Sequence, residues 1–267
     1  MSIKKTYLEV YTEHSGFVSH KWIHYFFIYD SIFKRFLEKE KPIKMLEIGV
    51  QNGGSLEIWK KYLPQGSIIH GLDIDKKCQL LKFSEDIFFH LGNATDFNFM
   101  EKTFGDTQFD VIIDDGSHVC KDVIQTFKYL FPKMKSGGCY IVEDMHTSYW
   151  KRFGGRIYGK KSSIEYFKNL IDCGVNRDYV QCDFFSKIKS KIHKQYNSDL
   201  EILKNISQIS FFDSICSIDK FYEPKDFSFK NVISGEVALV DKEPIELSIT
   251  INDRRNEITK TEKLFCG

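Results

Sequence analysis

Residues 45–55 read MLEIGVQNGGS, and this stretch determines which fold the sequence predicts. A short apolar run from residue 43 ends in a glycine-containing turn, and residues 55–62 then continue with a helical pattern. Glycines at such a turn let the backbone take positive φ and approach a ligand closely. The stretch therefore predicts a strand followed by a helix, as in a βαβ unit.

The same alternation continues along the chain. Further strands are predicted at residues 67–72, 87–91, 109–113 and 140–142. A helix before the last strand is predicted from the apolar spacing of Val119, Val123, Ile124, Phe127 and Leu130. Strands that alternate with helices form a parallel sheet covered on both faces, and right-handed crossovers make it doubly wound. Ligands then bind at the carboxyl ends of the strands, where the strand order reverses.

The flanking segments add to this core. An amphipathic helix is predicted over residues 19–40, with an apolar face that includes Trp22, and Pro42 stops it. After residue 150, a capped helix is predicted at 162–172, and residues 180–197 fit no single pattern. The last elements are a β-hairpin, with strands at 206–212 and 215–218, and a strand at 237–240. The predicted fold is thus a Rossmann-like, mostly parallel α/β sheet with an N-terminal helix and an inserted helical segment before a C-terminal hairpin.

The glycine loop has a spacing that argues against a dinucleotide. It reads E-x-G-x-x-x-G from Glu47, whereas pyrophosphate binders generally show G-x-G-x-x-G. The carboxylate of Glu47 would face phosphate oxygens in a dinucleotide site, but it suits a ligand with positive charge. S-adenosylmethionine carries a sulfonium and an ammonium group. Glu47, Gly49, Gly53 and Ser55 are therefore predicted to hold this cofactor.

Two further strand ends carry polar residues in the order that such a cofactor needs. Asp73 lies twenty residues after Gly53, about the separation at which an acid accepts the ribose hydroxyls. Asn93 follows the third strand and is predicted to meet the adenine edge. The alternative is that the two glycines only make a tight turn and that Asp73 only caps the turn at Asp75.

The fourth and fifth strands end in acidic segments, DDGSH at 114–118 and EDMH at 143–146. Because adjacent strand ends meet, four carboxylates and two histidines are expected in one pocket. So many acids do not stay ionised together without a cation, and carboxylate oxygens select a hard ion such as Mg²⁺ or Mn²⁺. The sequence therefore predicts a divalent-metal site.

His118 is the predicted general base, because it lies three residues after Asp115 at the start of a helix. A metal and a base both serve the transfer of a methyl group to a hydroxyl, which is a poor nucleophile when neutral. For Asp115 and Ser117, capping of the following helix stays open. For His146, substrate binding and core packing stay open, as do an acceptor pocket and ordinary packing for Tyr149 and Trp150.

Composition excludes several classes of protein. Lys and Arg number 38 and Asp and Glu 37, so the formal charge of +1 argues against a nucleic-acid binder. Four lysines between residues 187 and 194 are interpreted as a solvated face or loop. The seven cysteines form no C-x-x-C pair, which is typical of reduced thiols. Residues 1–10 lack the apolar core of a signal peptide, and residues 22–33 are too short for a membrane span. We expect a soluble, cytoplasmic protein.

Four segments together resemble a known family. They are LEIGVQNGGSLEIW (46–59), GLDID (71–75), FDVIIDDGSH (109–118) and VEDMHTSYW (142–150), with a looser likeness at 162–172 and 211–220. The sequence resembles class I S-adenosylmethionine-dependent methyltransferases. Within them it is most similar to metal-dependent sugar O-methyltransferases of macrolide-antibiotic pathways and to relatives from bacterial capsular polysaccharide clusters. The pairing of DDGSH with VED is the specific part of this likeness.

The resemblance implies a role for each predicted site residue. Asp115, Glu143 and Asp144 would bind magnesium, and His118 would be the general base. The cofactor residues would be Glu47, Gly49, Gly53, Ser55, Asp73, Asn93 and Asp114. The acceptor would be a small molecule, a sugar or nucleotide-sugar, and the assembly a homo-oligomer. Alternatives are a phosphoramidate, a catechol-like phenol or another small metabolite as acceptor, or an inactive nucleotide- or metal-binding module.

The sequence is predicted to divide into three parts. We expect an N-terminal helical extension at residues 1–42, a methyltransferase domain at 43–242 with an acceptor-side insertion at 151–205, and a C-terminal tail at 243–267.

Overall fold

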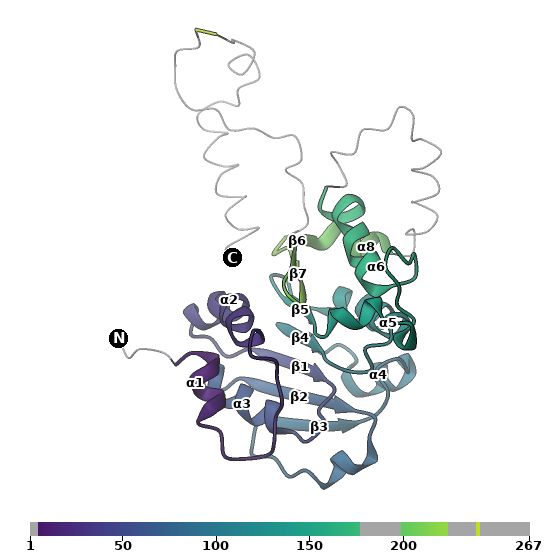
Figure 1. Cartoon of the computed structure of the whole chain (residues 1–267). Coiled ribbons are helices and arrows are strands. Elements are labelled where there is room, and N and C mark those ends of the chain that lie inside the picture. Colours follow the sequence, from purple (N-terminus) through teal and green to yellow (C-terminus); the bar gives the residue numbers. More distant parts are fainter. Residues whose placement is uncertain (1–4, 177–198, 224–238, 241–267) are drawn as a thin grey trace.

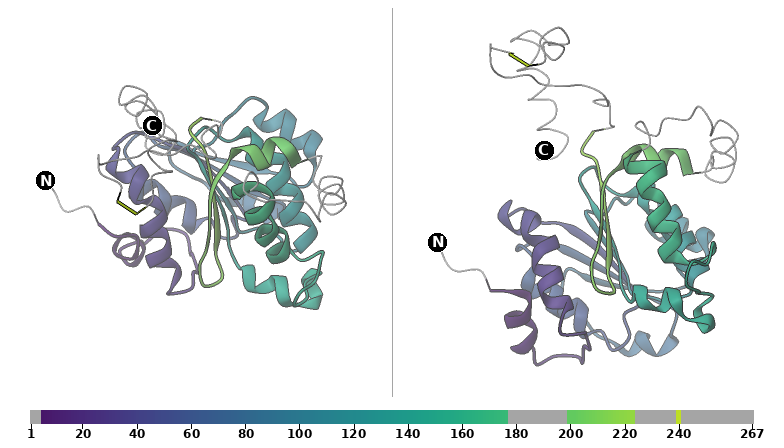
Figure 2. Two further views of the ribbon diagram at one scale, coloured as in Figure 1. Left: turned by 90° about the horizontal axis from the view of Figure 1, so that it is seen from above. Right: turned by 45° about the horizontal axis from the view of Figure 1, so that its top comes forward.

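The computed structural model describes residues 5–176, 199–223 and 239–240. In this part of the chain, one sheet is covered by helices on both faces (Figures 1 and 2). Its strands are β1 (Lys44–Ile48), β2 (Ile68–Asp73), β3 (Ile87–Leu91), β4 (Val111–Asp114), β5 (Cys139–Val142), β6 (Ile206–Phe211) and β7 (Cys216–Lys220). They lie in the order β3-β2-β1-β4-β5-β7-β6. The doubly wound α/β architecture is confirmed.

The helices form the two outer layers. They are α1 (Tyr7–Thr12), α2 (Tyr25–Glu38), α3 (Gly54–Tyr62), α4 (Phe97–Phe104), α5 (Cys120–Leu130), α6 (Ser163–Leu170) and α8 (Leu200–Asn205). Helices α1 to α3 cover one face, and α4, α5, α6 and α8 cover the other (Figure 2). Because β4 is pleated, Val111 and Ile113 pack into the core under α1, α2 and α3, and Ile112 packs into the core on the opposite face of the sheet. Among the described residues, no helix has the length and apolar character to cross a bilayer.

The strand pairing brings the predicted site residues to one edge of the sheet. Strand β1 pairs in parallel with β2 on one side and with β4 on the other, so the strand order reverses at β1 and β4. Strand β4 pairs in parallel with β5. The carboxyl ends of these four strands carry Gly49, Asp73, Asp114 and Glu143. Strand β7 is antiparallel to both β5 and β6, which confirms the predicted hairpin.

The N-terminal prediction needs a correction. Helix α2 begins at Tyr25 rather than Ser19, and the residues before it run across the carboxyl edge of the sheet. Trp22, which was placed on the apolar face, lies outside the helix and is half exposed. The physical reason is an ion pair: Lys21 reaches carboxylates at the ends of β4 and β5, and a turn at Trp22 starts the helix only after it.

Three helices, α1, α4 and α8, were not predicted from the sequence, and the first two have clear N-terminal caps. Helix α1 starts with a capping box, in which the Thr6 hydroxyl accepts from the Glu9 backbone and the Glu9 carboxylate accepts from the Thr6 backbone. Helix α4 is capped by Asp96, whose carboxylate accepts from the backbone of Asn98 and Phe99. Both caps are local signals. Each helix spans only two turns, and apolar periodicity is weak over such lengths.

The predictions for the segments after residue 150 can be compared with the structure only in part. Helix α6 begins after Ser162, whose hydroxyl accepts from the Glu165 backbone, and a π-helical turn continues it to Val175. The unassigned residues 180–197 lie outside the described residues. Of the predicted strand at 237–240, the described Leu239 and Val240 form a bend rather than a strand.

Two histidines on β2 and β3 give the fold a pH dependence. The rings of His70 and His90 stack, and Nδ1 of His70 lies 3.0 Å from Nε2 of His90. Burial, then His90 and Lys44, lower the pKa of His70 to about 4. A histidine whose folded pKa is depressed contributes stability above its unfolded pKa of about 6.5, and this is lost as the pH falls toward the folded value.

We therefore expect urea-unfolding experiments to show a smaller loss of stability between pH 7 and pH 5 for His70→Phe than for the parent protein. The other titrating groups are common to both proteins, so the difference reports on His70. Equal losses in the two proteins would contradict the prediction.

Candidate functional site

A cavity of about 920 Å³ opens at the carboxyl ends of β1, β2, β4 and β5, where the strand order reverses. Most of the predicted site residues line it: Glu47, Gly49, Ser55, Asp73, Asn93, Asp114, Asp115, His118 and Asp144. Gly53 and Glu143 do not line it. The cavity is also lined by residues 18–21, of which the sequence predicted residues 19–21 to begin a helix.

The first wall is the loop after β1. Gly49 has φ of +91°, and a Cβ atom there would lie 2.1 Å from the carbonyl oxygen of Asp115. Only glycine allows the loops after β1 and β4 to approach each other so closely. Gly53, with φ of +85°, is the N-cap of α3. The loop thus has the close approach and the helix start that the glycine spacing predicts.

Asp73 holds this loop in place. Its Oδ2 accepts hydrogen bonds from the backbone of Val50 and Gln51 at 2.8 and 2.9 Å, and its Oδ1 accepts from the Asp75 backbone at 2.8 Å. The carboxylate therefore bridges the ends of β1 and β2 while it faces the cavity. Asn93 lies on the next strand end, where its side-chain oxygen accepts from both the backbone and the hydroxyl of Thr95.

Glu47 is the feature of this wall that points most directly to a ligand. Its side chain is buried, and its Oε2 has no hydrogen-bond partner among the described residues. Burial raises the pKa of Glu47 to about 7, against the opposing charge of Lys21. A buried acceptor without a partner is costly, so a cationic ligand in the cavity would stabilise it.

Asp114, at the end of β4, is also buried at the cavity wall. The hydroxyl of Tyr140 donates to its Oδ2 at 3.1 Å, and the Gly116 backbone lies 3.4 Å from its Oδ1. Burial raises the pKa of Asp114 to about 7. A positively charged ligand in the cavity would favour the ionised form of this buried carboxyl group.

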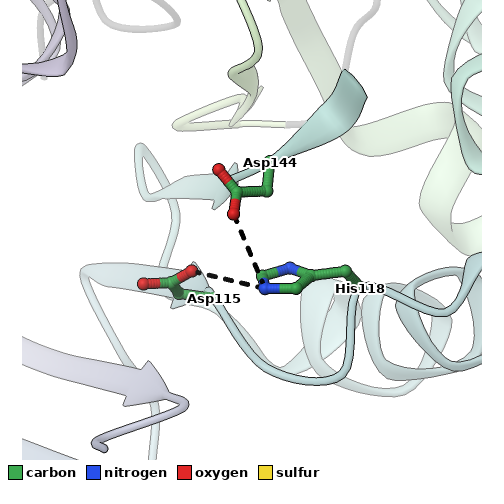
Figure 3. Close-up of side chains that lie close together, drawn as sticks. All are labelled: Asp115, His118 and Asp144. Atoms are coloured by element: carbon green, nitrogen blue, oxygen red, sulfur yellow. Dashed lines mark ion pairs between the residues drawn. The ribbon is translucent and has the colours of Figure 1, made fainter. Parts of the chain in front are cut away.

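The loops after β4 and β5 bring three polar side chains together (Figure 3). Nε2 of His118 lies 3.6 Å from Oδ2 of Asp144 and 3.9 Å from Oδ1 of Asp115. One ligand atom from each residue lies within 4.8 Å of the others, and each side chain is about one-quarter exposed. Two carboxylates and an imidazole at this spacing can converge on one divalent ion, and their oxygen-rich donor set fits Mg²⁺ or Mn²⁺.

The backbone is unusual at two members of this group. His118 has φ of +56° and Asp144 has φ of +53°, so both adopt the left-handed conformation. Such a backbone costs a non-glycine residue about 1–3 kcal/mol and occurs most often at functional sites. The two side chains face each other, with Nε2 of His118 3.6 Å from Oδ2 of Asp144.

Glu143 lies beside this group but points inward. The hydroxyl of Tyr29 donates to its Oε1, and the Nζ of Lys21 lies 2.6 Å from the same oxygen. Burial, and then the charge of Asp115, raise the pKa of Glu143 to about 8. Among the described residues, Glu143 is therefore not part of the group that converges on His118.

Lys21 is a candidate functional residue that was not predicted from the sequence. Its Nζ lies 2.6 Å from Oδ2 of Asp115 and 2.6 Å from Oε1 of Glu143, and its side chain is only 4% exposed. Burial favours the neutral amine, but Glu143, Asp115 and Glu47 outweigh it and hold the pKa of Lys21 well above its ordinary value. An ammonium group thus occupies the point on which these carboxylates converge.

Helix α2 supplies two more polar groups. The hydroxyl of Tyr25 donates to Oδ1 of Asp144 at 2.6 Å, and the Tyr29 hydroxyl donates to Glu143. No local sequence pattern marks these residues as site residues: Tyr25 and Tyr29 belong to the apolar face of the predicted helix, and Lys21 falls within the same predicted helix.

His146 packs beside the cavity and does not line it. Its Nδ1 lies 2.5 Å from the Ser214 hydroxyl, and its ring packs edge-on against Trp150 and, more distantly, Trp22. Tyr149 and Trp150 are both nearly half exposed, beside the site rather than within the core.

Comparison with known proteins agrees with this geometry. Mycinamicin VI 2''-O-methyltransferase from Micromonospora griseorubida is 36% identical over 157 residues, which are 54% of this chain and 38% of that protein. Demethylmacrocin O-methyltransferase from Streptomyces fradiae is 34% identical over 174 residues, 59% of this chain and 42% of that protein. The MycE methyltransferase of the mycinamycin pathway, solved in complex with Mg and SAH, superposes with a TM-score of 0.67 at 25% identity. This is the class I methyltransferase fold.

The likeness to this methyltransferase structure is broader than the sequence match. The superposition covers 92% of this chain and 60% of the MycE chain. A second MycE structure, in complex with Mg, SAH and mycinamycin VI, superposes with a TM-score of 0.64 at 26% identity. The chain spans about two fifths of the length of the curated methyltransferases that it matches. No family model matches the chain.

Proposed function

We propose that this protein transfers a methyl group from S-adenosylmethionine to a hydroxyl oxygen of a sugar, with the help of Mg²⁺ or Mn²⁺. The observation that carries the proposal is the convergence of Asp115, His118 and Asp144 in one cavity of a class I methyltransferase fold, together with Glu47. The buried Oε2 of Glu47 has no hydrogen-bond partner among the described residues. Relatives whose names state a sugar O-methyltransferase support the acceptor class. A setting in bacterial capsular polysaccharide or other glycan biosynthesis belongs to the same proposal.

The cofactor would lie between the β1 loop and the end of β2. Gly49 would let the backbone approach it, and Asp73 and Asn93 line the same cavity, where Asp73 would meet the ribose and Asn93 the adenine edge. Glu47 and Asp114 face the cavity as buried acids whose pKa values are raised to about 7. Both would be stabilised as carboxylates by the positive charges of S-adenosylmethionine, which supplies an activated methyl group.

The metal set we propose is Asp115, Glu143 and Asp144. Asp115 and Asp144 face one point with His118, whereas Glu143 faces Lys21. Asp115 links the two, because it also pairs with the ammonium of Lys21. A divalent ion bound by this set would hold vicinal acceptor oxygens and lower the pKa of the hydroxyl that reacts. His118 would accept the proton of that hydroxyl at Nε2, and Asp115 and Asp144 would stabilise the imidazolium that forms.

Calorimetric titration with S-adenosylhomocysteine tests the central claim, with NAD as the control ligand. We expect S-adenosylhomocysteine to bind and NAD not to bind, because the loop spacing and the carboxylate of Glu47 disfavour a pyrophosphate. Binding of NAD alone, or of neither ligand to folded protein, would refute the proposal.

An acceptor screen with and without chelator then tests the metal and the acceptor. We expect methylation of a sugar, lost with chelator and restored by Mg²⁺ or Mn²⁺. Methylation of a phosphoramidate, a phenol or another metabolite instead would keep the enzyme class and change the acceptor. Binding of S-adenosylhomocysteine without any methyl transfer across these acceptor classes would favour the inactive nucleotide- or metal-binding module.

A further inference from the structure

Residues 151–161, called here the basic segment, carry a local excess of positive charge. They read KRFGGRIYGKK and hold five cationic side chains and no acidic one, in a chain whose formal charge is only +1. The five are Lys151, Arg152, Arg156, Lys160 and Lys161, and all are exposed. The proposed reaction uses none of them.

The basic segment is fixed against the site. The Arg156 backbone donates to the carbonyl of Ser148 at 2.9 Å, and the Gly155 backbone donates to that of Trp150 at 3.0 Å. A Cβ atom on Gly155 would lie 2.2 Å from the Ser148 carbonyl oxygen, so the two backbones are in close contact. Ser148 belongs to the short helical turn Met145–Tyr149, which directly follows Asp144. The segment is therefore attached to the turn that directly follows Asp144, a proposed metal ligand.

Arg152 is connected to the proposed base through an aromatic side chain. Its guanidinium carbon lies 4.7 Å from the ring centre of Phe153 and 4.8 Å from that of Trp150. The Phe153 ring in turn meets the His118 ring edge-on at 6.2 Å, so one aromatic ring separates Arg152 from the proposed base. Stacking orients the planar guanidinium and leaves its N–H edge open to an acceptor.

The charges of the basic segment are not neutralised within the described part of the chain. Elsewhere, exposed or half-exposed cations such as Lys60, Lys135 and Lys168 each pair with a carboxylate. For the five cations of the basic segment, none of the described residues provides such an ion pair. Several unpaired cations on a fixed backbone create a positive potential that attracts anions, and charge-assisted hydrogen bonds from Arg to phosphate or carboxylate are strong.

We propose that the basic segment binds a negatively charged group of the acceptor, so that the methylated sugar carries a phosphate or a carboxylate. This inference rests on the proposed function, because it places the anionic group beside Arg152 and the reacting hydroxyl beside His118. The chemistry is shared by nucleoside diphosphate sugars, sugar phosphates and uronic acids, which the experiment separates.

The test is a calorimetric titration of the full chain, saturated with S-adenosylhomocysteine and Mg²⁺, with three pairs of probes. Each pair joins an anion to its neutral counterpart: UDP-glucose with uridine, glucose 1-phosphate with methyl glucoside, and glucuronate with glucose. We expect at least one anion to bind about tenfold to a hundredfold more tightly than its counterpart. The pair with the largest ratio identifies the source of the charge.

Variants locate the binding. Arg152→Gln combined with Arg156→Gln should lower the affinity for the preferred anion by about tenfold or more and leave the affinity for S-adenosylhomocysteine unchanged. The matched control is Lys34→Gln combined with Lys102→Gln, which removes the same charge from exposed positions on α2 and α4 and should change neither affinity.

Two outcomes would overturn the inference: no anion binds better than its neutral counterpart, or the double arginine variant binds the anion as well as the control variant does. In either case, intact binding of S-adenosylhomocysteine would show that the proposed function itself stands. Failure of S-adenosylhomocysteine to bind in the first place would refute the proposed function instead, which keeps the two failures distinct.

Discussion

Replacing His118 by asparagine should lower the turnover of methyl transfer by about 10²–10⁴-fold, the usual contribution of a general base. Asparagine tolerates the left-handed backbone that His118 adopts at φ of +56°, so the loop keeps its shape while the proton acceptor is lost. The measurement is the steady-state rate with an acceptor that the parent protein methylates. The affinity for S-adenosylhomocysteine should not change, because His118 lies on the metal side of the cavity.

Two further measurements make this prediction specific. Titration with Mg²⁺ distinguishes a base from a metal ligand, since His118 also belongs to the converging group: an unchanged metal affinity supports the base, and a large loss supports a ligand. His146→Asn serves as the control, because this histidine binds Ser214 and lies outside the cavity. Near-normal turnover of His118→Asn with intact cofactor binding would remove His118 as the base.

Replacing Lys21 by methionine should have the largest effect on stability. Removing one partner of a buried ion pair leaves uncompensated charge and costs about 3–5 kcal/mol. Here the two carboxylates of Asp115 and Glu143 lose their common ammonium, and the high pKa of Glu143 shows that burial already disfavours its charged form. In the presence of chelator, we expect calorimetry to show a Tm lower by roughly 6–15 °C.

Addition of Mg²⁺ should raise the Tm of Lys21→Met more than that of the parent protein, because the ion replaces the missing positive charge among the same carboxylates. Lys34→Met is the matched control: Lys34 is exposed, its nearest carboxylate is that of Glu38 at 3.9 Å, and its loss should change the Tm little. A Tm of Lys21→Met within about 1 °C of the parent value, in chelator, would show that the ammonium is not needed to balance the acids.

The core of the fold was predictable because its signals are local. Strand β1, its glycine turn and α3 follow from apolar runs, glycines and helical spacing within twenty residues, and the same holds for β4, α5 and β5. The hairpin of β6 and β7 is again a short-range pattern. Helix α1 had a local signal in its capping box, but six residues are too few for a periodic pattern to stand out.

The candidate site was predictable as far as strand ends define it. Parallel strands end at one edge, so Asp73, Asp115 and Asp144 could be placed in one pocket from the order of the strands alone. The direction in which each side chain points could not be predicted from the sequence. Glu143 and Asp144 are neighbours in sequence, yet one faces Lys21 and Tyr29 while the other faces His118. The backbone of Asp144 is left-handed, with φ of +53°, and the residue types do not predict this conformation.

The sequence by itself thus determined the alternation of strands and helices, the glycine loop and the acids at the strand ends, because each depends on residues close together in the chain. Only the tertiary structure decided that Lys21 is the counter-charge of these acids. Its partners Asp115 and Glu143 lie 94 and 122 residues away, and the segment before α2 reads locally as one more helical turn. A nearby cation offsets the free energy of burying carboxylates, and the identity of that cation depends on how the whole chain packs.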